Sequence, residues 1–285
     1  MLSRIIAARV LGWSTVAAAL VAGLSALAGA VEAASLGPMA AAGLALTQVP
    51  AALTLLMPIL AALGAAVAAA RMAALGEELA LACGGISPWR TGAAAAGVGL
   101  LLGLAQWGCA DLVVSHAEAH RRTLLSESDA PWVWLDGAAI HPESRLKIEL
   151  EDDQISAIRP LVAGEVSEAE LARAAMLQQP RTASGAALAG STLTSAKLEH
   201  LSRRVRVVAC GLLAWLVWVT GIGHAGTRRI GGALVIAVGW QALDLLLYTA
   251  AAQGRLPVLL GGAGAAIVLA AVLLVRFAQS SSRSM

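Results

Sequence analysis

Val49 to Arg90 reads VPAALTLLMPILAALGAAVAAARMAALGEELALACGGISPWR. Its first part, Ala51 to Ala70, contains 20 residues without a charged side chain. That is the length at which an α-helix crosses the roughly 30 Å hydrocarbon layer of a bilayer. Arg71 follows the apolar run, so the stretch predicts a membrane-spanning helix that ends there in a polar loop.

The loop after Arg71 has the pattern of a short helix over about residues 72–84. Apolar residues recur at every fourth position, and two acidic residues lie near the start: Leu75, Leu79 and Cys83, with Glu77 and Glu78. Such spacing gives a helix one apolar side. Residues suited to end this helix and to begin the next one follow directly: Gly84, Gly85, Ser87 and Pro88. We therefore expect a surface helix held between two spans.

The whole chain has the composition of a membrane protein. Of its 285 residues, 58% are hydrophobic and 13% are charged, whereas about 25% of residues are charged in a typical soluble domain. Six segments are apolar and of a length that suits a span: about Val10–Val31, Ala51–Ala70, the interval between Arg90 and Asp111, Val207–Gly223, Ile230–Ala252 and Pro257–Val275. On the third, Gly99 and Gly103 predict close helix packing, within the chain or in a dimer.

A polar insert separates the third span from the fourth. Residues 119–200 hold 12 of the 18 acidic and 8 of the 20 basic residues. The fold class that we predict is a mainly α membrane protein with six transmembrane helices, three before and three after a small β-rich domain. Its parts are residues 1–118 with three spans and the surface helix, residues 119–200 with the external domain and a linker, and residues 201–285 with three spans and a tail.

Strand patterns occur in the first half of the insert. The segment Trp132–Ile140 (WVWLDGAAI) is rich in bulky apolar residues, and apolar and charged residues alternate over residues 146–151. A turn at Asp152 and Asp153 leads to a third short strand. From Ser167 to Gln178 the pattern becomes helical, with Ser167 as the expected cap.

The distribution of arginine predicts how the chain crosses the membrane. Cytoplasmic loops are enriched in basic residues, and in a six-span order one side collects most of them: Arg4, Arg9, Arg71, Arg90, Arg228, Arg229, Arg276 and Arg283. That side should be the cytoplasm, with both termini on it and the insert outside. Three arginines fall on the outer side, at the start of the fourth span: Arg203, Arg204 and Arg206.

Several classes of function are disfavoured by the sequence. A nucleic-acid partner is not expected, because the chain has one Tyr, one Phe and only two lysines. The three cysteines lie outside the insert, where they suggest neither a disulfide framework nor a Cys-based zinc site. Neither Lys147 nor Lys197 follows a Gly-rich phosphate-binding turn. We expect no cofactor, no metal and no catalytic residue, and ATP hydrolysis would have to come from another chain.

The Val49–Arg90 stretch closely resembles the corresponding segment of the LptF/LptG (YjgP/YjgQ) permease family. The shared features are a proline before the span, a second proline inside it, a basic residue at its end, an acidic residue in the loop and a Gly-Ile-Ser run: Pro50, Pro58, Arg71, Glu77 and Gly85-Ile86-Ser87. The last two spans, Asp244 and the GRLPVLLG stretch from Gly254 to Gly261 are also similar to the family. The insert of about 80 residues is short, so the chain looks like a member with a reduced, truncated jellyroll-like periplasmic domain.

The resemblance implies a function. Members of this family are the membrane subunits of the bacterial ABC transporter that extracts lipopolysaccharide from the inner membrane. It implies a cytoplasmic ABC ATPase dimer and a homologous permease subunit as partners, a periplasmic bridge protein as a third, and lipopolysaccharide or a related anionic lipid as the substrate. It also implies a multi-pass inner-membrane location. The loop helix would be the coupling helix that docks on the ATPase.

Site residues follow in part from the resemblance and in part from their chemistry. The expected ATPase-coupling residues are Glu77, Glu78, Leu75, Leu79, Arg71, Gly85 and Ser87, with Glu77 as the main acidic contact. Arg203, Arg204 and Arg206 could bind lipid phosphates, since guanidinium groups bind phosphate bidentately, or could extend to the interface as ordinary cationic side chains. Asp244 lies inside a span and should face the bundle or a partner, in a structural hydrogen bond or in proton transfer.

Two other functions remain open at this stage. The chain could be a scaffold that transports nothing and recruits an envelope protein through its external domain. A membrane-bound metal hydrolase could use His116 and His120, which are four residues apart with Glu118 between them. The zinc-hydrolase pattern has Glu directly after the first His, and this chain does not.

Overall fold

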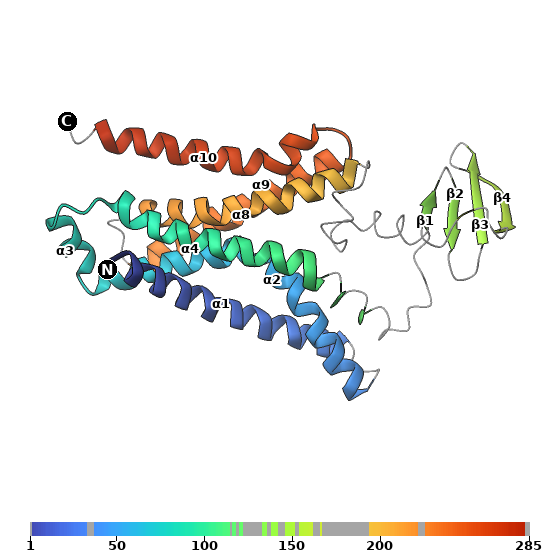
Figure 1. The fold of residues 1–285 in the computed structure, drawn as a ribbon, viewed down its shortest axis with the longest axis horizontal. Coiled ribbons are helices and arrows are strands. Elements are labelled where there is room, and N and C mark those ends of the chain that lie inside the picture. The colour runs from blue at the N-terminus through green and yellow to red at the C-terminus, as the bar shows by residue number, and fades with distance from the viewer. Residues whose placement is uncertain are drawn as a thin grey trace.

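Long apolar helices make up most of the structure, a computed structural model that describes residues 2–32, 37–114, 116, 117, 120, 121, 133–135, 138–141, 146–151, 154–161, 166, 194–221 and 226–282. The helices are α1 (Leu2–Glu32), α2 (Pro38–Ala74), α3 (Glu77–Cys83), α4 (Pro88–Gly108), α8 (Thr194–Thr220), α9 (Gly226–Ala252) and α10 (Val258–Ser282). A π-helical turn, η2 (Cys109–Val114), continues α4. The long helices run side by side, and both termini lie at the end of the bundle that carries α3 (Figure 1).

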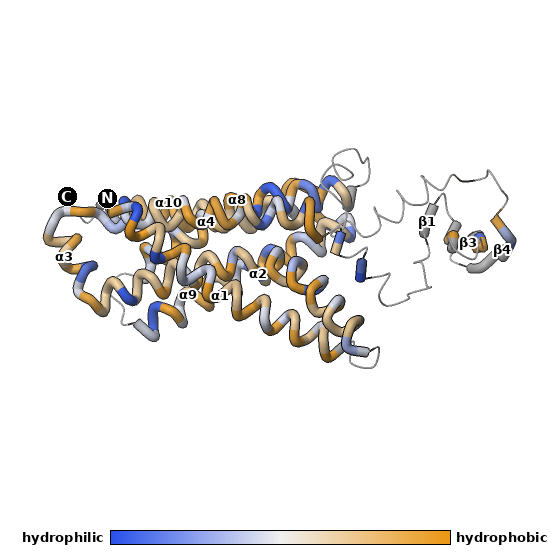
Figure 2. Tube along the Cα trace, turned by 60° about the horizontal axis from the view of Figure 1, so that its bottom comes forward, coloured by the Kyte–Doolittle hydropathy of each residue, from blue (hydrophilic) through white to orange (hydrophobic). Residues whose placement is uncertain are grey.

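Five of these helices are long and apolar enough to cross a membrane: α1, α2, α4 with η2, α9 and α10. The expected fourth span, Val207–Gly223, falls mainly in α8, which is not among the five. The reason is its first half, where charged residues are frequent: Lys197, Glu199, Arg203, Arg204 and Arg206. In Figure 2 this part of α8 is the most hydrophilic portion of a long helix. The structure therefore supports five of the six expected spans. The sixth corresponds to α8, a helix of 27 residues within the bundle, and stays a prediction.

Local residues explain where α2 begins and ends. Gly37 has a φ of 98°, and Pro38 follows at the first helical position, where its missing N–H costs nothing. The helix continues through Pro50 and Pro58 to Ala74. Gly76, with a φ of 72°, then separates α2 from α3. The surface helix is therefore shorter than the predicted residues 72–84, because residues 72–74 belong to the preceding span.

Small residues allow α4 and α8 to pack closely. A side-chain carbon added at Gly103 would lie 2.7 Å from the Val207 backbone, and one at Gly99 would collide with the backbone at Cys210. Any larger residue would force the two helices apart. The predicted close packing at Gly99 and Gly103 is thus a contact within this chain.

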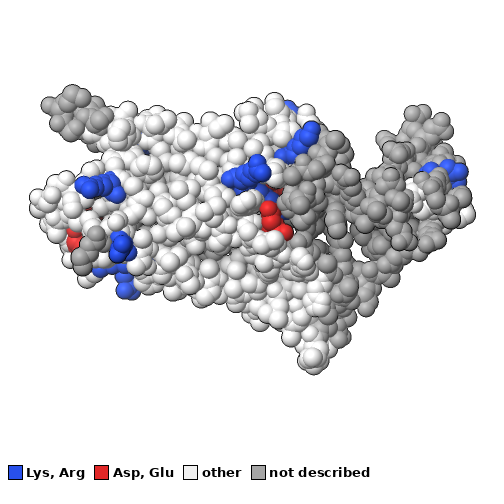
Figure 3. All heavy atoms as spheres, in the orientation of Figure 1, with Lys and Arg blue, Asp and Glu red and all other residues white. Residues whose placement is uncertain are grey.

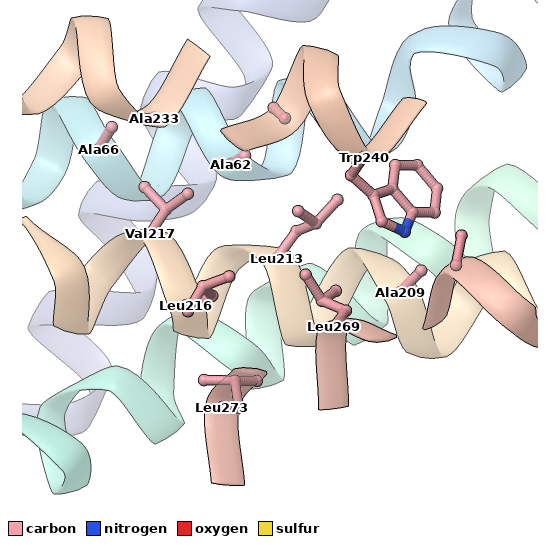
Figure 4. Packing of buried hydrophobic residues seen from close by; sticks show 12 residues of the cluster. Ala62, Ala66, Ala209, Leu213, Leu216, Val217, Ala233, Trp240, Leu269 and Leu273 are labelled. Carbon is pink, nitrogen blue, oxygen red and sulfur yellow. The ribbon is translucent and has the colours of Figure 1, made fainter. Parts of the chain in front are cut away.

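The main hydrophobic core is centred on the second half of α8. Figure 4 shows Leu213, Leu216 and Val217 between residues of α2, α9 and α10. The buried members of this cluster are Ala62, Ala66, Ala209, Leu213, Leu216, Val217, Ala233, Ala237, Trp240, Ala265, Leu269 and Leu273. α8 therefore has little surface left for lipid along this half, and its position in the bundle is fixed on three sides.

The described part of the insert is a four-stranded antiparallel sheet in the order β1-β2-β3-β4, made of β1 (Val133–Leu135), β2 (Ala138–His141), β3 (Leu146–Glu151) and β4 (Gln154–Pro160). The Trp132–Ile140 segment, expected as one strand, contributes the two strands β1 and β2, which pair Val133 with Ile140. The predicted turn at Asp152 and Asp153 lies outside the described residues, and Glu151 and Gln154 on either side of it are paired. No second sheet occurs among the described residues of the insert, so the jellyroll-like domain stays a prediction. The expected helix Ser167–Gln178 lies outside the described residues.

Charged side chains gather at two levels of the bundle. On the face drawn in Figure 3, they occur near the end with α3 and again near the start of α8, and an uncharged zone separates them. This distribution is that of a protein whose middle lies in hydrocarbon. It also defines two places, one at each end, where polar chemistry can occur.

Candidate functional site

The short helix α3 is an exposed element at one end of the bundle, with no buried residue. It is ended by two hydrogen bonds in which the Ile86 N–H and the Gly85 N–H donate, at 3.0 Å each, to the carbonyls of Leu81 and Ala82. Gly85 has a φ of 71°, which favours glycine. The Ser87 hydroxyl then accepts a hydrogen bond of 3.2 Å from the Trp89 N–H at the start of α4. Gly85 and Ser87 thus form the turn that presents α3.

Two leucines, one just before α3 and one on it, face solvent. The relative exposure of Leu75 is 67%, and that of Leu79 is 70%. Leu81, in contrast, packs against the core formed by α1, α2, α4 and α8. Leu75 is the C-terminal cap of α2, and Leu79 belongs to α3. Outside a membrane, two such exposed leucines form a surface that a protein partner could cover.

Glu77 binds α1. The Arg9 guanidinium donates two hydrogen bonds to the Glu77 carboxylate, of which the one from Nη2 to Oε1 measures 2.9 Å. The Arg9 and Glu77 side chains are 34% and 36% exposed. The hydrogen bonds from Arg9 lower the pKa of Glu77 below its ordinary value. Arg9 therefore orients Glu77, whose side chain stays partly exposed to solvent.

Glu78, the next residue, binds α9. Arg229 Nη1 donates to Glu78 Oε2 at 3.0 Å, and Arg229 Nη2 lies 3.5 Å from Glu78 Oε1. The Arg229 side chain is 1% exposed and that of Glu78 is 30% exposed. The two adjacent acids thus reach in different directions, so α3 is linked by ion pairs to the first and the fifth long helix of the chain.

Arg71 does not take part in this arrangement. Its guanidinium lies 4.6 Å from the centre of the Trp13 ring, in a cation–π contact between α2 and α1. The predicted coupling residue Arg71 therefore stabilises the packing of α1 against α2. The Arg71 carbonyl also accepts a hydrogen bond of 3.0 Å from the Leu75 N–H at the end of α2.

A second polar cluster lies at the other end of the bundle, around the first half of α8. Arg203 Nη1 donates to Asp111 Oδ1 at 2.7 Å, and Arg203 Nε donates to Glu199 Oε1 at 3.1 Å. The Tyr248 hydroxyl donates to Glu199 Oε2 at 2.9 Å. The Arg203 side chain is 5% exposed. Arg203 is thus buried and neutralised by two carboxylates.

Arg206 and Asp244 form the other half of this cluster. Arg206 donates to Asp244 Oδ2 from Nη2 at 3.0 Å and from Nε at 3.2 Å. The Asp244 side chain is 6% exposed. Asp244 therefore faces the bundle in an ion pair, which offsets the cost of a carboxylate inside a span. Arg204, which lies between the two paired arginines in sequence, is exposed, and no ion pair of Arg204 is seen with any described residue.

A cavity of about 220 Å³ adjoins the cluster, between α2, the end of α4 and α8. Its polar lining comes from Thr54, Gln106, Glu199, Arg203 and Arg206. The Gln106 amide donates to the Thr54 carbonyl at 2.5 Å, and the Cys210 thiol donates to Gln106 Oε1 at 3.4 Å. Most polar groups around the cavity thus already have partners within the chain.

Sequence reasoning did not identify the partners of the charged residues. Arg9 is 68 residues from Glu77, and no local spacing connects them. The Glu199–Arg203 pair, four residues apart in one helix, is a spacing that could have been recognised. His116 Nδ1 lies 2.7 Å from the Leu112 carbonyl of its own helix. The part of the chain that the structure describes contains no group of three potential metal ligands.

Comparison with known proteins identifies the first half of the chain. Residues 2–131 match the family model described as "Lipopolysaccharide export system permease LptF/LptG". The match includes α1, α2, α3, α4 and η2, and with them Arg9, Glu77 and Glu78. No curated protein matches the chain significantly.

Proposed function

Because residues 2–131 assign this chain to the LptF/LptG permease family, we propose that it is a permease subunit of an ABC transporter. In this proposal a separate cytoplasmic ATPase dimer drives the extraction of lipopolysaccharide, or of a related anionic lipid, from the inner membrane. The five apolar helices and the family agree with a multi-pass inner-membrane protein. The observation that carries the proposal is the geometry of α3.

α3 has the features of a docking helix. Leu79 of α3 and Leu75, just before this helix, are exposed and available to a partner, whereas the two acids of α3 are bound to α1 and α9. A force applied to the leucines would therefore reach two long helices at once. This arrangement supports α3 as the ATPase-coupling element, with Leu75 and Leu79 as the apolar contact. The partly exposed Glu77 side chain would supply the charged contact.

We further propose α8 as the sixth span. Its second half is at the centre of the core, and the charged side chains Arg203 and Arg206 of its first half are paired with carboxylates of the chain. A paired charge at a bundle interior is compatible with a membrane-spanning helix. Both termini and α3 then lie in the cytoplasm, and the sheet lies in the periplasm, where a bridge protein could bind.

A homologous second subunit is part of the proposal. Pockets that enclose a drug-sized ligand measure about 300–1,000 Å³, whereas the cavity beside Arg203 measures about 220 Å³. It is too small for a lipid. The lipid path must therefore form between this bundle and another one.

The structure changes which arginine is the best candidate for the lipid phosphate. Arg203 and Arg206 are neutralised inside the bundle, so a phosphate would have to displace carboxylates from them. Arg204 is exposed between them. We therefore assign the lipid contact to Arg204 and a structural role to Arg203, Arg206 and Asp244.

Purification of the tagged chain from membranes tests the proposal. We expect an ATP-hydrolysing subunit to copurify with the wild-type chain and with the control Ala80→Asp, an exposed position on the same helix. Leu79→Asp should lose most of that subunit, because a carboxylate replaces the apolar contact. A wild-type complex without ATPase activity would contradict the proposal, and so would a Leu79→Asp complex with the full amount of ATPase.

A further inference from the structure

The two acids of α3 are bound to very different arginines. Arg9 is 34% exposed and Arg229 is 1% exposed. An exposed ion pair is screened by water and contributes little to stability or to the transmission of a force. The pair with Arg229 is different, because removal of the Glu78 carboxylate would leave the charge of a buried arginine uncompensated. The ion pair of Glu78 with Arg229 therefore holds α3 to the bundle more strongly than the pair of Glu77 with Arg9 does.

Arg229 connects four helices. It lies in the first turn of α9, and its guanidinium donates to Glu78 of α3, to the Trp218 carbonyl of α8 at 3.2 Å and to the Ala69 carbonyl of α2 at 3.3 Å. Trp218 and Ala69 are both near the carboxyl ends of their helices. Cations are favourable at such ends. The Trp218 indole also donates to the Thr91 hydroxyl of α4 at 3.0 Å, which extends the connection to a fifth helix.

The backbone around this arginine is adapted to it. Gly221, directly after α8, lies against the Arg229 side chain: a side-chain carbon at position 221 would be 2.6 Å from Arg229 Cγ. Only glycine leaves the space that the arginine occupies. A cavity of about 70 Å³ adjoins the pair and is lined by Glu78, Arg229 and Trp218 among others. The site is thus closely fitted to the arginine on one side and has free volume on another.

We propose that Glu78 and Arg229 are positioning residues that pass a displacement of α3 to the carboxyl end of α8 and to α9. This inference rests on the proposed function, because it assumes that an ATPase moves α3. Glu77 and Arg9 have a different task, which is to orient α3 and present its charge to the partner. The two neighbouring acids are therefore not interchangeable.

The test compares Glu78→Gln with the matched control Ala80→Gln, an exposed position on the same helix, in the whole complex. The complex is reconstituted in phosphatidylethanolamine–phosphatidylglycerol vesicles that contain lipopolysaccharide as the probe. The quantity measured is the amount of lipid extracted per ATP hydrolysed. Glu78→Gln should lower it at least fivefold while ATP hydrolysis continues and the amount of bound ATPase stays unchanged. Ala80→Gln should change this ratio less than twofold.

A second variant addresses the arginine. Arg229→Lys keeps the charge but lacks the planar guanidinium whose two Nη atoms reach Glu78, Trp218 and Ala69. It should therefore lower the same ratio as Glu78→Gln does. Unchanged lipid extraction per ATP in Glu78→Gln, with ATPase bound, overturns this inference and leaves the proposed function intact. A wild-type complex that contains no ATP-hydrolysing subunit overturns both.

Discussion

The ion pair between Asp244 and Arg206 offers a quantitative test of how the start of α8 is held in the bundle. Asp244 is 4% exposed and receives two hydrogen bonds of 3.0 and 3.2 Å from Arg206. Asp244→Ala leaves a buried guanidinium without its counter-ion, and the loss of one member of a buried pair costs about 3–5 kcal/mol. Asp244→Asn keeps an acceptor and should cost about 1.5–3 kcal/mol, the range for hydrogen bonds to charged groups.

The measurement is unfolding of the detergent-solubilised protein, followed by the fluorescence of its eight tryptophans. Arg204→Gln is the matched control, because Arg204 is exposed and should change the free energy of unfolding by less than about 0.5 kcal/mol. The double substitution Asp244→Leu with Arg206→Met should recover most of the stability, since an apolar pair of similar volume often replaces a buried ion pair without loss. If Asp244→Ala costs less than about 1 kcal/mol, the buried pair is not what fixes α8 here.

Three further predictions concern the other parts of the bundle. The charge swap Arg9→Glu with Glu77→Arg should restore the ion pair between α1 and α3 but reverse the charge that α3 presents to a partner. ATPase binding should therefore stay at least tenfold weaker than in the wild type. Recovery of wild-type binding would mean that Glu77 acts only within the chain. Gly103→Val should destabilise the protein by about 1–3 kcal/mol, as overpacking does, because its side chain meets the Val207 backbone, and unchanged unfolding would show that α4 can move away from α8. Cys83 is exposed on α3, so a membrane-impermeant maleimide should label it in inside-out vesicles and not in intact cells; labelling from outside would reverse the proposed orientation.

The helices were predictable because lipid imposes a simple rule on sequence. A segment such as Ala51–Ala70 must be apolar over its whole length to span hydrocarbon, and α2 includes it completely. Helix ends were predicted less well, since they depend on single backbone conformations. Gly76 has the left-handed conformation that separates α2 from α3, and nothing in the apolar pattern distinguishes it from the other glycines nearby.

The fourth span shows the limit of the apolar rule. α8 begins at Thr194, before residue 201, where the second membrane half was expected to start. The ion pair between Glu199 and Arg203 extends the helix beyond its apolar part. A hydropathy scale treats each charged residue as unpaired. It takes no account of the ion pair between Arg203 and Asp111, which are 92 residues apart in sequence. Pairings at such distances are decided by tertiary packing, which a single sequence does not contain.

The sequence predicted the location of the candidate site but not which of its residues form ion pairs with each other. Leu75 and Leu79 are exposed on or next to a short helix, as their spacing suggested. Glu77 and Glu78, however, were expected to act together on a partner. In the structure each binds an arginine of its own chain. Adjacent residues of a helix point about 100° apart, so two neighbouring acids reach different neighbours whenever both sides offer a cation.

α8 joins the two polar ends of the molecule. Its last turn supplies the Trp218 carbonyl to Arg229, and its first half carries Arg203 and Arg206. A helix of 27 residues is about 40 Å long at 1.5 Å per residue, and the middle of α8 is packed on α2, α9 and α10. Under the proposed function, a displacement of α3 that reaches Arg229 would move α8 as a rigid body. The exposed Arg204 at its opposite end would then move with it, which links ATP-driven motion at one membrane surface to a lipid contact at the other.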